Sequence, residues 1–296
     1  MKQEEKRLML ERREHLNLRY IEESIFKAGM ILSVFVVMAS LLAIFGTVII
    51  KGGSSLSFEM LTRTPTGSYY LGKGGGILNA IAGSLLLAIP ATLIAYIISL
   101  GLALFLQREF THPKAASLIR LSLDILWGTP SIVYGIFCLT VMVLVGLGTS
   151  LLAGIIALTL LEIPIITRSI DDALRNVPDG LREASYSLGS TRIETVFSIV
   201  RRQAHPGIVS GILLGFGRGI GDAASILFTA GFSDRIPLSL MDATAALPTM
   251  IFNLFSSPIA AVRERAYASA FILLVIVLII SSAARALTKS SVKSMV

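Results

Sequence analysis

The sequence predicts an all-α polytopic membrane protein with six transmembrane helices, and two observations carry this prediction. Of the 296 residues, 54% are hydrophobic and 15% are charged, with a mean hydropathy of +0.77. A soluble domain carries about 25% charged residues. The apolar residues also form uncharged runs long enough to cross the ~30 Å hydrocarbon core of a bilayer. A cytosolic enzyme, a coiled coil and a disordered chain are therefore poor fits.

The N-terminal part contains a charged tail, a first span and a loop. Residues 1–25 mix acidic and basic side chains, which is typical of a solvated cytoplasmic tail. The first span is predicted over 26–50, because 28–50 is an uncharged run of 23 residues. Such a run is too long for the core of a signal peptide. Residues 51–76 are rich in Gly, Ser and Thr, and we expect an external loop there.

The second, third and fourth spans follow. Residues 77–106 are uncharged and contain Pro90, which favours a kink. Residues 121–167 are too many for one helix, and turn-forming residues at 146–150 divide them into two spans. The next segment, 168–205, is polar and predicts a cytoplasmic loop.

The fifth and sixth spans flank a proline-rich segment. Residues 206–233 are apolar apart from a few charged or polar positions, and 266–284 are uncharged. Between them, 236–262 contains three prolines, so we expect an external re-entrant or interfacial segment rather than a crossing helix. Residues 289–296 form a short cytoplasmic tail.

Positive charges set the predicted orientation, because Lys and Arg concentrate on the cytoplasmic side of membrane proteins. With a cytoplasmic N-terminus and six spans, 19 of the 26 Lys and Arg residues lie inside and six lie outside. This bias predicts that both termini are cytoplasmic. It also explains the net charge of +7 without nucleic acid, and leaves membrane lipid as the partner that the composition implies.

No catalytic or metal site is predicted. The single cysteine, Cys138, lies in an apolar run, and no histidine has a second ligand at metal-binding spacing. No GxxxxGK[ST] phosphate loop is present, so we expect this chain to bind no cofactor and not to hydrolyse ATP by itself. The glycine run at 217–221 lacks the spacing and the preceding strand of a dinucleotide site, and we reject that interpretation.

The polar loop contains a helix–glycine–helix pattern. Leu181, Ala184 and Leu188 share one helical face, and Gly189 stands where a C-cap glycine is expected. Residues 191–194 then have the spacing of a capping box, which restarts a helix. The apolar face either packs on the chain's own bundle or docks on a cytoplasmic partner.

Two charged residues of the fifth span are functional candidates, because a charge in a span costs at least ~2.5–3.5 kcal/mol. Arg218 and Asp222 are four residues apart on one helix and can pair. They form either a self-neutralising ion pair or a pathway in which the guanidinium binds an oxyanion and the carboxylate holds it at rest. The nearby glycines at 215–221 allow close packing or local unwinding. Thr129 and Ser131 flank a proline and either pack or offer polar groups to the same anion.

Two carboxylates lie near the predicted cytoplasmic ends of spans. Asp124 is expected to reach towards water or to pair with Arg120, four residues earlier. Glu162 is expected to pair with Arg168 or to brace the cytoplasmic loop.

The cytoplasmic loop resembles the EAA signature of ABC importer permeases, a loop that inserts into a groove of the ATP-hydrolysing subunit in that family. The matching residues are Glu183, Ala184, Ser185, Gly189 and Ile199. Further blocks are similar to the phosphate importer permeases; they lie at 75–84, 128–135, 175–178 and 217–224.

The resemblance implies a type I (MetI-like) transmembrane fold over 77–288, with a coupling loop at 170–205, in the plasma membrane of a prokaryote, the inner membrane if Gram-negative. It implies a permease subunit for phosphate. The implied partners are a second homologous permease, two copies of an ATP-binding subunit that uses ATP and Mg, and an external phosphate-binding protein. The candidate pathway residues are then Arg218, Asp222, Thr129 and Ser131. The candidate coupling-loop residues are Leu181, Glu183, Ala184, Leu188, Gly189 and Ile199.

The chain departs from the family pattern at two places. Arg201 and Arg202 stand where the family usually has Leu-Pro, which changes the exit from the second coupling helix. Asp222 replaces the usual Glu and has a shorter arm. The alternative functions are an ABC permease for another oxyanion such as sulfate or molybdate, a secondary transporter without an ATPase, and a membrane sensor that moves nothing.

Overall fold

The computed structural model of the chain describes residues 2–67, 69–72 and 74–293, and within these the side chains of 2–18, Ile21 and 283–293 are not described. The end of the predicted tail 289–296 therefore lies outside the described residues. All regular elements in the described residues are helical, which confirms the all-α prediction. The chain divides into two units, Met1–Ile50 and Lys51–Val296.

The first unit is one long helix, α1 (Lys2–Thr47), which runs into a π-helical turn, η1 (Val48–Gly52). From Glu22 to Gly52 it is apolar, with a mean hydropathy of 2.6 in its best window, and none of that window is buried in this chain. A helix that is apolar all round needs protein or lipid around it. The predicted first span, 26–50, lies within this segment.

The second unit is built around α6 (Leu151–Arg175), which packs between α3 (Leu78–Phe105) and α10 (His205–Ile220). Within the most apolar window of α6, 72% of the residues are buried. One buried cluster joins Ala95 of α3 and Ile166 of α6 to Ile208 of α10. The helix α6 begins at a side-chain cap, because the Ser150 hydroxyl accepts the Ala153 N–H at 3.3 Å.

The predicted third span is a broken helix. The helices α4 (Pro113–Gly128) and α5 (Ser131–Leu144) meet at an angle of 96°. Proline disfavours the helical conformation in the residue before it, and Thr129 accordingly adopts an extended conformation with ψ of 131° before Pro130. Residues 129 and 130 therefore interrupt this span between the two helices.

The fifth predicted span, 206–233, is shorter in the structure. The helix α10 has 16 residues, about 24 Å at 1.5 Å per residue. It ends before Gly221, and a short helix, α11 (Ala224–Leu227), follows. Among the described residues, four helices are long and apolar enough to cross a membrane, or up to five if α4 and α5 together count as one. The expected count of six differs because α10 unwinds early.

The proline-rich segment 236–262 contains α12 (Leu247–Phe255), whose nine residues are too few to cross a bilayer. This helix packs on α13 (Ala260–Lys293), the last long apolar helix of the second unit.

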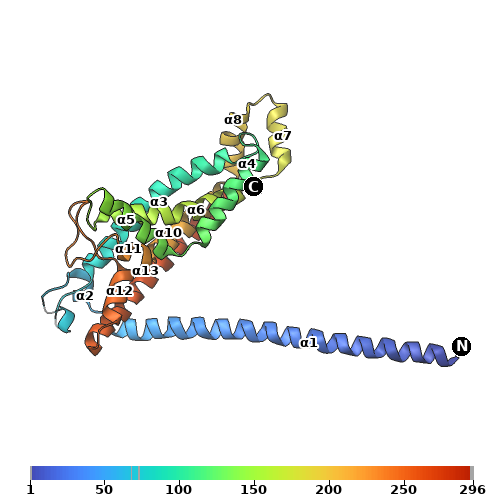
Figure 1. Ribbon diagram of the computed structural model, residues 1–296, viewed down its shortest axis with the longest axis horizontal. Helices are drawn as coiled ribbons and strands as arrows, with labels where there is room; N and C mark the ends of the chain where they lie inside the picture. Colours follow the sequence, from blue (N-terminus) through green and yellow to red (C-terminus); the bar gives the residue numbers. More distant parts are fainter. Residues whose placement is uncertain (1, 68, 73, 294–296) are drawn as a thin grey trace. The chain divides into compact units, whose positions relative to one another are not determined.

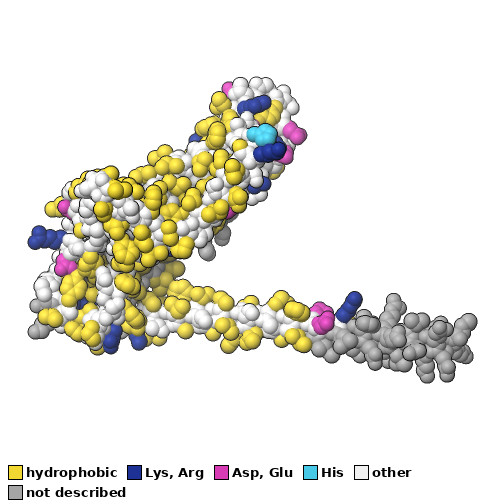
Figure 2. Space-filling view, viewed as in Figure 1, with side chains coloured by type: hydrophobic (Ala, Val, Ile, Leu, Met, Phe, Trp, Pro, Cys, Tyr) yellow, Lys and Arg dark blue, Asp and Glu magenta, His cyan; other side chains and the backbone are white. Residues whose placement is uncertain are grey.

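The two ends of the second unit are formed by different short elements. One end carries α7 (Asp179–Ser187) and α8 (Arg192–Glu194), followed by η3 (Thr195–Val200) and α9 (Arg201–Gln203). The opposite end carries α12 with two short turns, α2 (Phe58–Thr62) and η2 (Tyr69–Leu71) (Figure 1). In Figure 2, charged side chains lie at the α7 end and at the opposite end, whereas hydrophobic side chains cover the helices between the two ends.

Candidate functional site

The end of α10 holds the predicted ion pair. Arg218 Nη1 lies 2.8 Å from Asp222 Oδ1, so the pairing inferred from their spacing is confirmed. The Arg218 side chain is 46% exposed, whereas that of Asp222 is 3% exposed. Asp222 Oδ2 also accepts hydrogen bonds from the Ser225 N–H at 2.8 Å and the Ser225 hydroxyl at 2.6 Å. The Asp222 carboxylate is therefore fixed at the start of α11. It pairs with the Arg218 guanidinium, whose side chain remains partly exposed.

Four glycines let α10 approach α6 closely. A Cβ atom on any of them would lie within 2.9 Å of a side-chain atom of α6. The pairs run antiparallel, with the glycines four residues apart and their α6 partners three or four apart: Gly207 against Ala173, Gly211 against Ser169, Gly215 against Ile166 and Gly219 against Glu162. Small residues at such spacing are how membrane helices pack backbone to backbone. The structure thus shows close packing along α10 and unwinding just beyond it.

Glu162 lies under Gly219, at the end of this glycine series. It is fully buried, and neither carboxyl oxygen has a hydrogen-bond partner among the described residues. The expectation that it pairs with Arg168 is wrong, because Arg168 Nε instead lies 2.6 Å from Asp124 Oδ1. A carboxyl with no partner in an apolar interior is costly, which makes this position unusual.

The other predicted carboxylate pair is also corrected. Asp124 pairs with Arg168 of α6 rather than with Arg120 of its own helix. Arg120 instead contacts the buried Asp171 through two hydrogen bonds, at 2.7 Å and 3.0 Å. The planar guanidinium favours this two-point contact with a carboxylate on a neighbouring helix.

Thr129 and Ser131 lie at the bend between α4 and α5 and are partly buried. The Thr129 hydroxyl donates to the Ile125 carbonyl at 3.0 Å, so its proton is already used within α4. No hydrogen bond in the described residues joins either side chain to Arg218. The bend is connected to the ion pair only indirectly, through α11. Gly135 of α5 packs against the Ser225 backbone, and Ser225 donates hydrogen bonds to Asp222.

The predicted helix–glycine–helix pattern of the polar loop is present. Gly189 ends α7 with φ of +84°, a conformation that favours glycine. Thr191 and Glu194 form the capping box, with the Thr191 N–H donating to Glu194 Oε2 at 2.8 Å. That backbone hydrogen bond, with one from the Thr191 hydroxyl, lowers the pKa of Glu194.

Val196 and Val200 of this loop pack on the bundle, but a second set of its apolar side chains is exposed. Leu188 is 87% exposed and Ile193 is 62% exposed, and Leu181, Phe197 and Ile199 are also exposed. Glu183 and Ala184 are exposed as well. Between the two alternatives stated for this face, the structure favours an unpaired surface. We call Leu181, Ala184, Leu188, Ile193 and Phe197 the docking face.

A buried ion pair behind the docking face was not predicted. Arg182 of α7 contacts Glu109, which lies in the segment between α3 and α4. Their side chains are 3% and 4% exposed. The available signal was helical spacing: Arg182 and Ser185 are three residues apart and both face inwards. Their partners are distant in sequence and could not be found from it.

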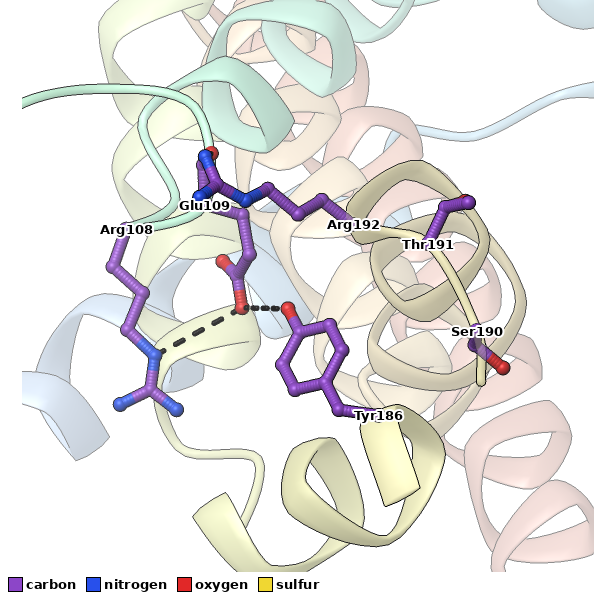
Figure 3. Close-up of a pocket in the computed structure, with 6 residues that line it drawn as sticks. All are labelled: Arg108, Glu109, Tyr186, Ser190, Thr191 and Arg192. Atoms are coloured by element: carbon purple, nitrogen blue, oxygen red, sulfur yellow. Dashed lines mark hydrogen bonds and ion pairs between the residues drawn. The ribbon is translucent and has the colours of Figure 1, made fainter. Parts of the chain in front are cut away.

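A cavity of about 540 Å³ opens beside Glu109 (Figure 3). Its lining residues are Arg108, Glu109, Tyr186, Ser190, Thr191 and Arg192. No group of three or more His, Cys, Asp or Glu residues that could hold a metal ion exists among the described residues.

Residues 98–293 match the family described as the binding-protein-dependent transport system inner membrane component. The chain belongs to this family. It is 36% identical over 243 residues to the phosphate transport system permease protein PstA of Yersinia pestis, covering 82% of this chain and 81% of that protein. It is 34% identical over 232 residues to a probable ABC transporter permease, YqgI of Bacillus subtilis, covering 74% of this chain and 78% of that protein.

Solved structures support the fold. The inward-facing MetNI methionine ABC transporter includes a chain that matches with a TM-score of 0.60 at 21% identity, covering 73% of this chain and 95% of that chain. An amino acid ABC transporter chain matches with a TM-score of 0.57 at 20% identity, covering 72% and 93%. The predicted resemblance to a type I importer transmembrane fold is confirmed, and so is the similarity to phosphate permeases.

Proposed function

We propose that this chain is the permease subunit of an ATP-driven importer that moves inorganic phosphate from an external binding protein into the cytoplasm. The observation that carries the proposal is the exposed docking face, because a folded helical loop with unpaired Leu, Ile and Phe side chains is typical of a protein–protein contact. The similarity to PstA proteins over four-fifths of the chain supports phosphate as the substrate.

The proposed assembly has four kinds of subunit. This chain pairs with a PstC-like permease, two PstB-like ATP-binding subunits contact the α7 end, and a PstS-like protein delivers phosphate at the opposite end. ATP and Mg belong to the ATP-binding subunits, and the permease binds no cofactor. Both termini and the α7 end are then cytoplasmic, in the inner membrane if the cell is Gram-negative.

Arg218 is the proposed contact for phosphate. Its guanidinium is about half exposed and is held by a fixed carboxylate at a point where α10 unwinds. An incoming phosphate competes with Asp222 for the same planar donors. In the proposed cycle, the ATP-binding subunits close and move the docking face that they contact. This movement switches the two permeases between two states, which expose Arg218 to the outside and to the cytoplasm in turn.

Uptake of radiolabelled phosphate by vesicles that contain the complete complex tests this proposal, with and without ATP on the cytoplasmic side. We expect ATP-dependent uptake by the wild type. For Arg218→Ala we expect a loss of about tenfold or more, because hydrogen bonds to charged groups are worth about 1.5–3 kcal/mol. Lys27→Ala, which removes an exposed charge from α1, is the matched control and should change uptake little.

The outcomes separate the alternatives. Uptake that persists in Arg218→Ala would reduce the ion pair to a structural role and leave the importer intact. Uptake driven by an ion gradient without ATP would indicate a secondary transporter, and ATP hydrolysis without phosphate uptake would direct the test to sulfate and molybdate. The absence of any flux would favour a sensor.

A further inference from the structure

The segment between α3 and α4 forms hydrogen bonds with side chains of the coupling loop. We call residues 106–112 the elbow. The Arg182 guanidinium of α7 donates to Glu109 Oε1, to Gln107 Oε1 at 3.3 Å and to the Leu174 carbonyl at 3.1 Å. One buried side chain of the coupling loop therefore contacts the elbow and the end of α6 at once.

Both helices of the coupling loop contact Glu109 (Figure 3). The Tyr186 hydroxyl of α7 points at the Glu109 carboxylate and donates to Oε1 at 3.4 Å. Arg192 of α8 reaches the Glu109 backbone carbonyl at 3.4 Å. On the outer side, Arg108 contacts Asp179 at 2.7 Å. The elbow and the coupling loop are thus joined at several points around one residue.

The elbow is in turn tied to α4 and α6. The Gln107 amide donates to Asp171 Oδ1 at 3.2 Å, and Arg120 of α4 holds the same carboxylate. Arg120 also donates to the Leu106 carbonyl at 2.9 Å. A short series of direct contacts therefore connects α7 to α4, and α4 leads to the 96° bend before α5.

A contribution to folding stability does not by itself explain why Arg182 and Glu109 form a buried ion pair. A buried ion pair contributes little net stability compared with well-packed apolar side chains. Here Glu109 Oε2 and Arg182 Nε have no hydrogen-bond partner in the described residues, so the pair is not fully satisfied. Its position is more informative than its energy, because Arg182 directly follows Leu181 of the docking face and its head group contacts the elbow.

Resting on the proposed function, we propose that the Arg182–Glu109 pair is the link through which movement of the docking face is passed to the elbow and α4. Arg182 is then a positioning residue for transport. The pair is needed to couple ATP hydrolysis to transport, and it is not needed for assembly of the complex or for ATP hydrolysis itself.

The test measures phosphate taken up per ATP hydrolysed by the reconstituted complex, together with co-purification of the ATP-binding subunit. We expect Arg182→Met and Glu109→Gln each to assemble, to retain hydrolysis and to lower the ratio by about tenfold. The double variant should be no worse than either single variant, because the two side chains act as one unit. Arg182→Lys keeps the charge but not all three contacts, and should fall between Arg182→Met and the wild type.

Arg202→Met is the matched control, because it removes an exposed charge from the same 170–205 loop, and Arg202 contacts neither Glu109 nor Arg182 in the described residues. It should keep the ratio near that of the wild type. An unchanged ratio in Arg182→Met, losses that multiply in the double variant, or an equal loss in Arg202→Met would each overturn the proposal. Failure of Arg182→Met and Glu109→Gln to assemble would also overturn it, since the pair would then be an assembly element.

An error in the proposed substrate would be recognised separately. If phosphate is not the substrate, the wild-type complex itself takes up no phosphate. In that case the readout is stimulation of ATP hydrolysis by the substrate-loaded binding protein. We expect Arg182→Met to lose this stimulation and to keep basal hydrolysis, and persistence of the stimulation would overturn the link.

Discussion

The α6–α10 interface and the α7 end of the same unit hold helices together by opposite means. At the interface, four glycines bring the two backbones close, and the carboxyl that lies there, Glu162, has no partner among the described residues. At the α7 end, guanidinium–carboxylate pairs join α4, α6, α7 and the elbow. In an apolar surrounding the hydrophobic effect no longer drives helices together, so close van der Waals packing between complementary surfaces has to stabilise their association. Near water, charged pairs become usable.

This comparison makes a general prediction. Loss of charge should matter most at the α7 end, and added volume should matter most between α6 and α10. Three substitutions test it, in order of decreasing expected effect on the free energy of unfolding of the protein purified in detergent.

Arg120→Met should have the largest effect. It removes the two-point contact of the fully buried Asp171 carboxylate, which keeps one contact to Arg168 Nη1 at 3.3 Å. Removing one member of a buried pair typically costs about 3–5 kcal/mol, because the remaining charge stays buried, and the remaining Arg168 contact places the expected loss at the lower end of that range. Chemical denaturation followed by fluorescence measures the change. Arg63→Met is the matched control, since the Arg63–Glu59 pair is largely exposed and such pairs contribute about 0–1 kcal/mol. Equal losses in the two variants would contradict the assignment of the α7 end to buried ion pairing.

Gly219→Ala should have the next largest effect. Its Cβ would lie 1.9 Å from Glu162 Oε1, and overpacking of this kind costs about 1–3 kcal/mol. Gly217→Ala is the control on the same helix, because nothing lies within 4 Å of its Cβ. The double variant Gly219→Ala with Glu162→Ala should recover part of the loss by removing the overlap. A loss of equal size in Gly217→Ala would mean that helix propensity, and not contact with α6, sets the result.

The parts of the molecule that sequence predicts well are those encoded locally. Gly189 and the capping box at 191–194 depend only on neighbouring residues, and the spans depend on runs of apolar residues. The partners of Arg182 could not be predicted, because Glu109 is 73 residues away and only the fold brings it close.

The expected Glu162–Arg168 pair does not form in the described residues, for a physical reason. Glu162 precedes Arg168 by six residues, whereas residues on one helical face are three, four or seven apart. The spacing therefore placed the two side chains on different faces of α6, and Glu162 faces α10 instead. The length of α10 was overestimated because hydropathy continues past Gly221, where the backbone does not stay helical.

Glu162→Gln should have the smallest effect of the three, and it provides the sharpest contrast between the two regions. Because no positive charge faces this carboxyl in the described residues, replacing it with a neutral amide of nearly the same shape breaks no ion pair. We expect a change below about 1 kcal/mol, as for a volume-conserving substitution that leaves packing intact. Glu162→Ala, which removes volume beside Gly219 and Gly215, should cost more. If Glu162→Gln were instead as damaging as Arg120→Met, the carboxylate would have an ionic partner in the working complex, and the α6–α10 interface would depend on charge in the same way as the α7 end.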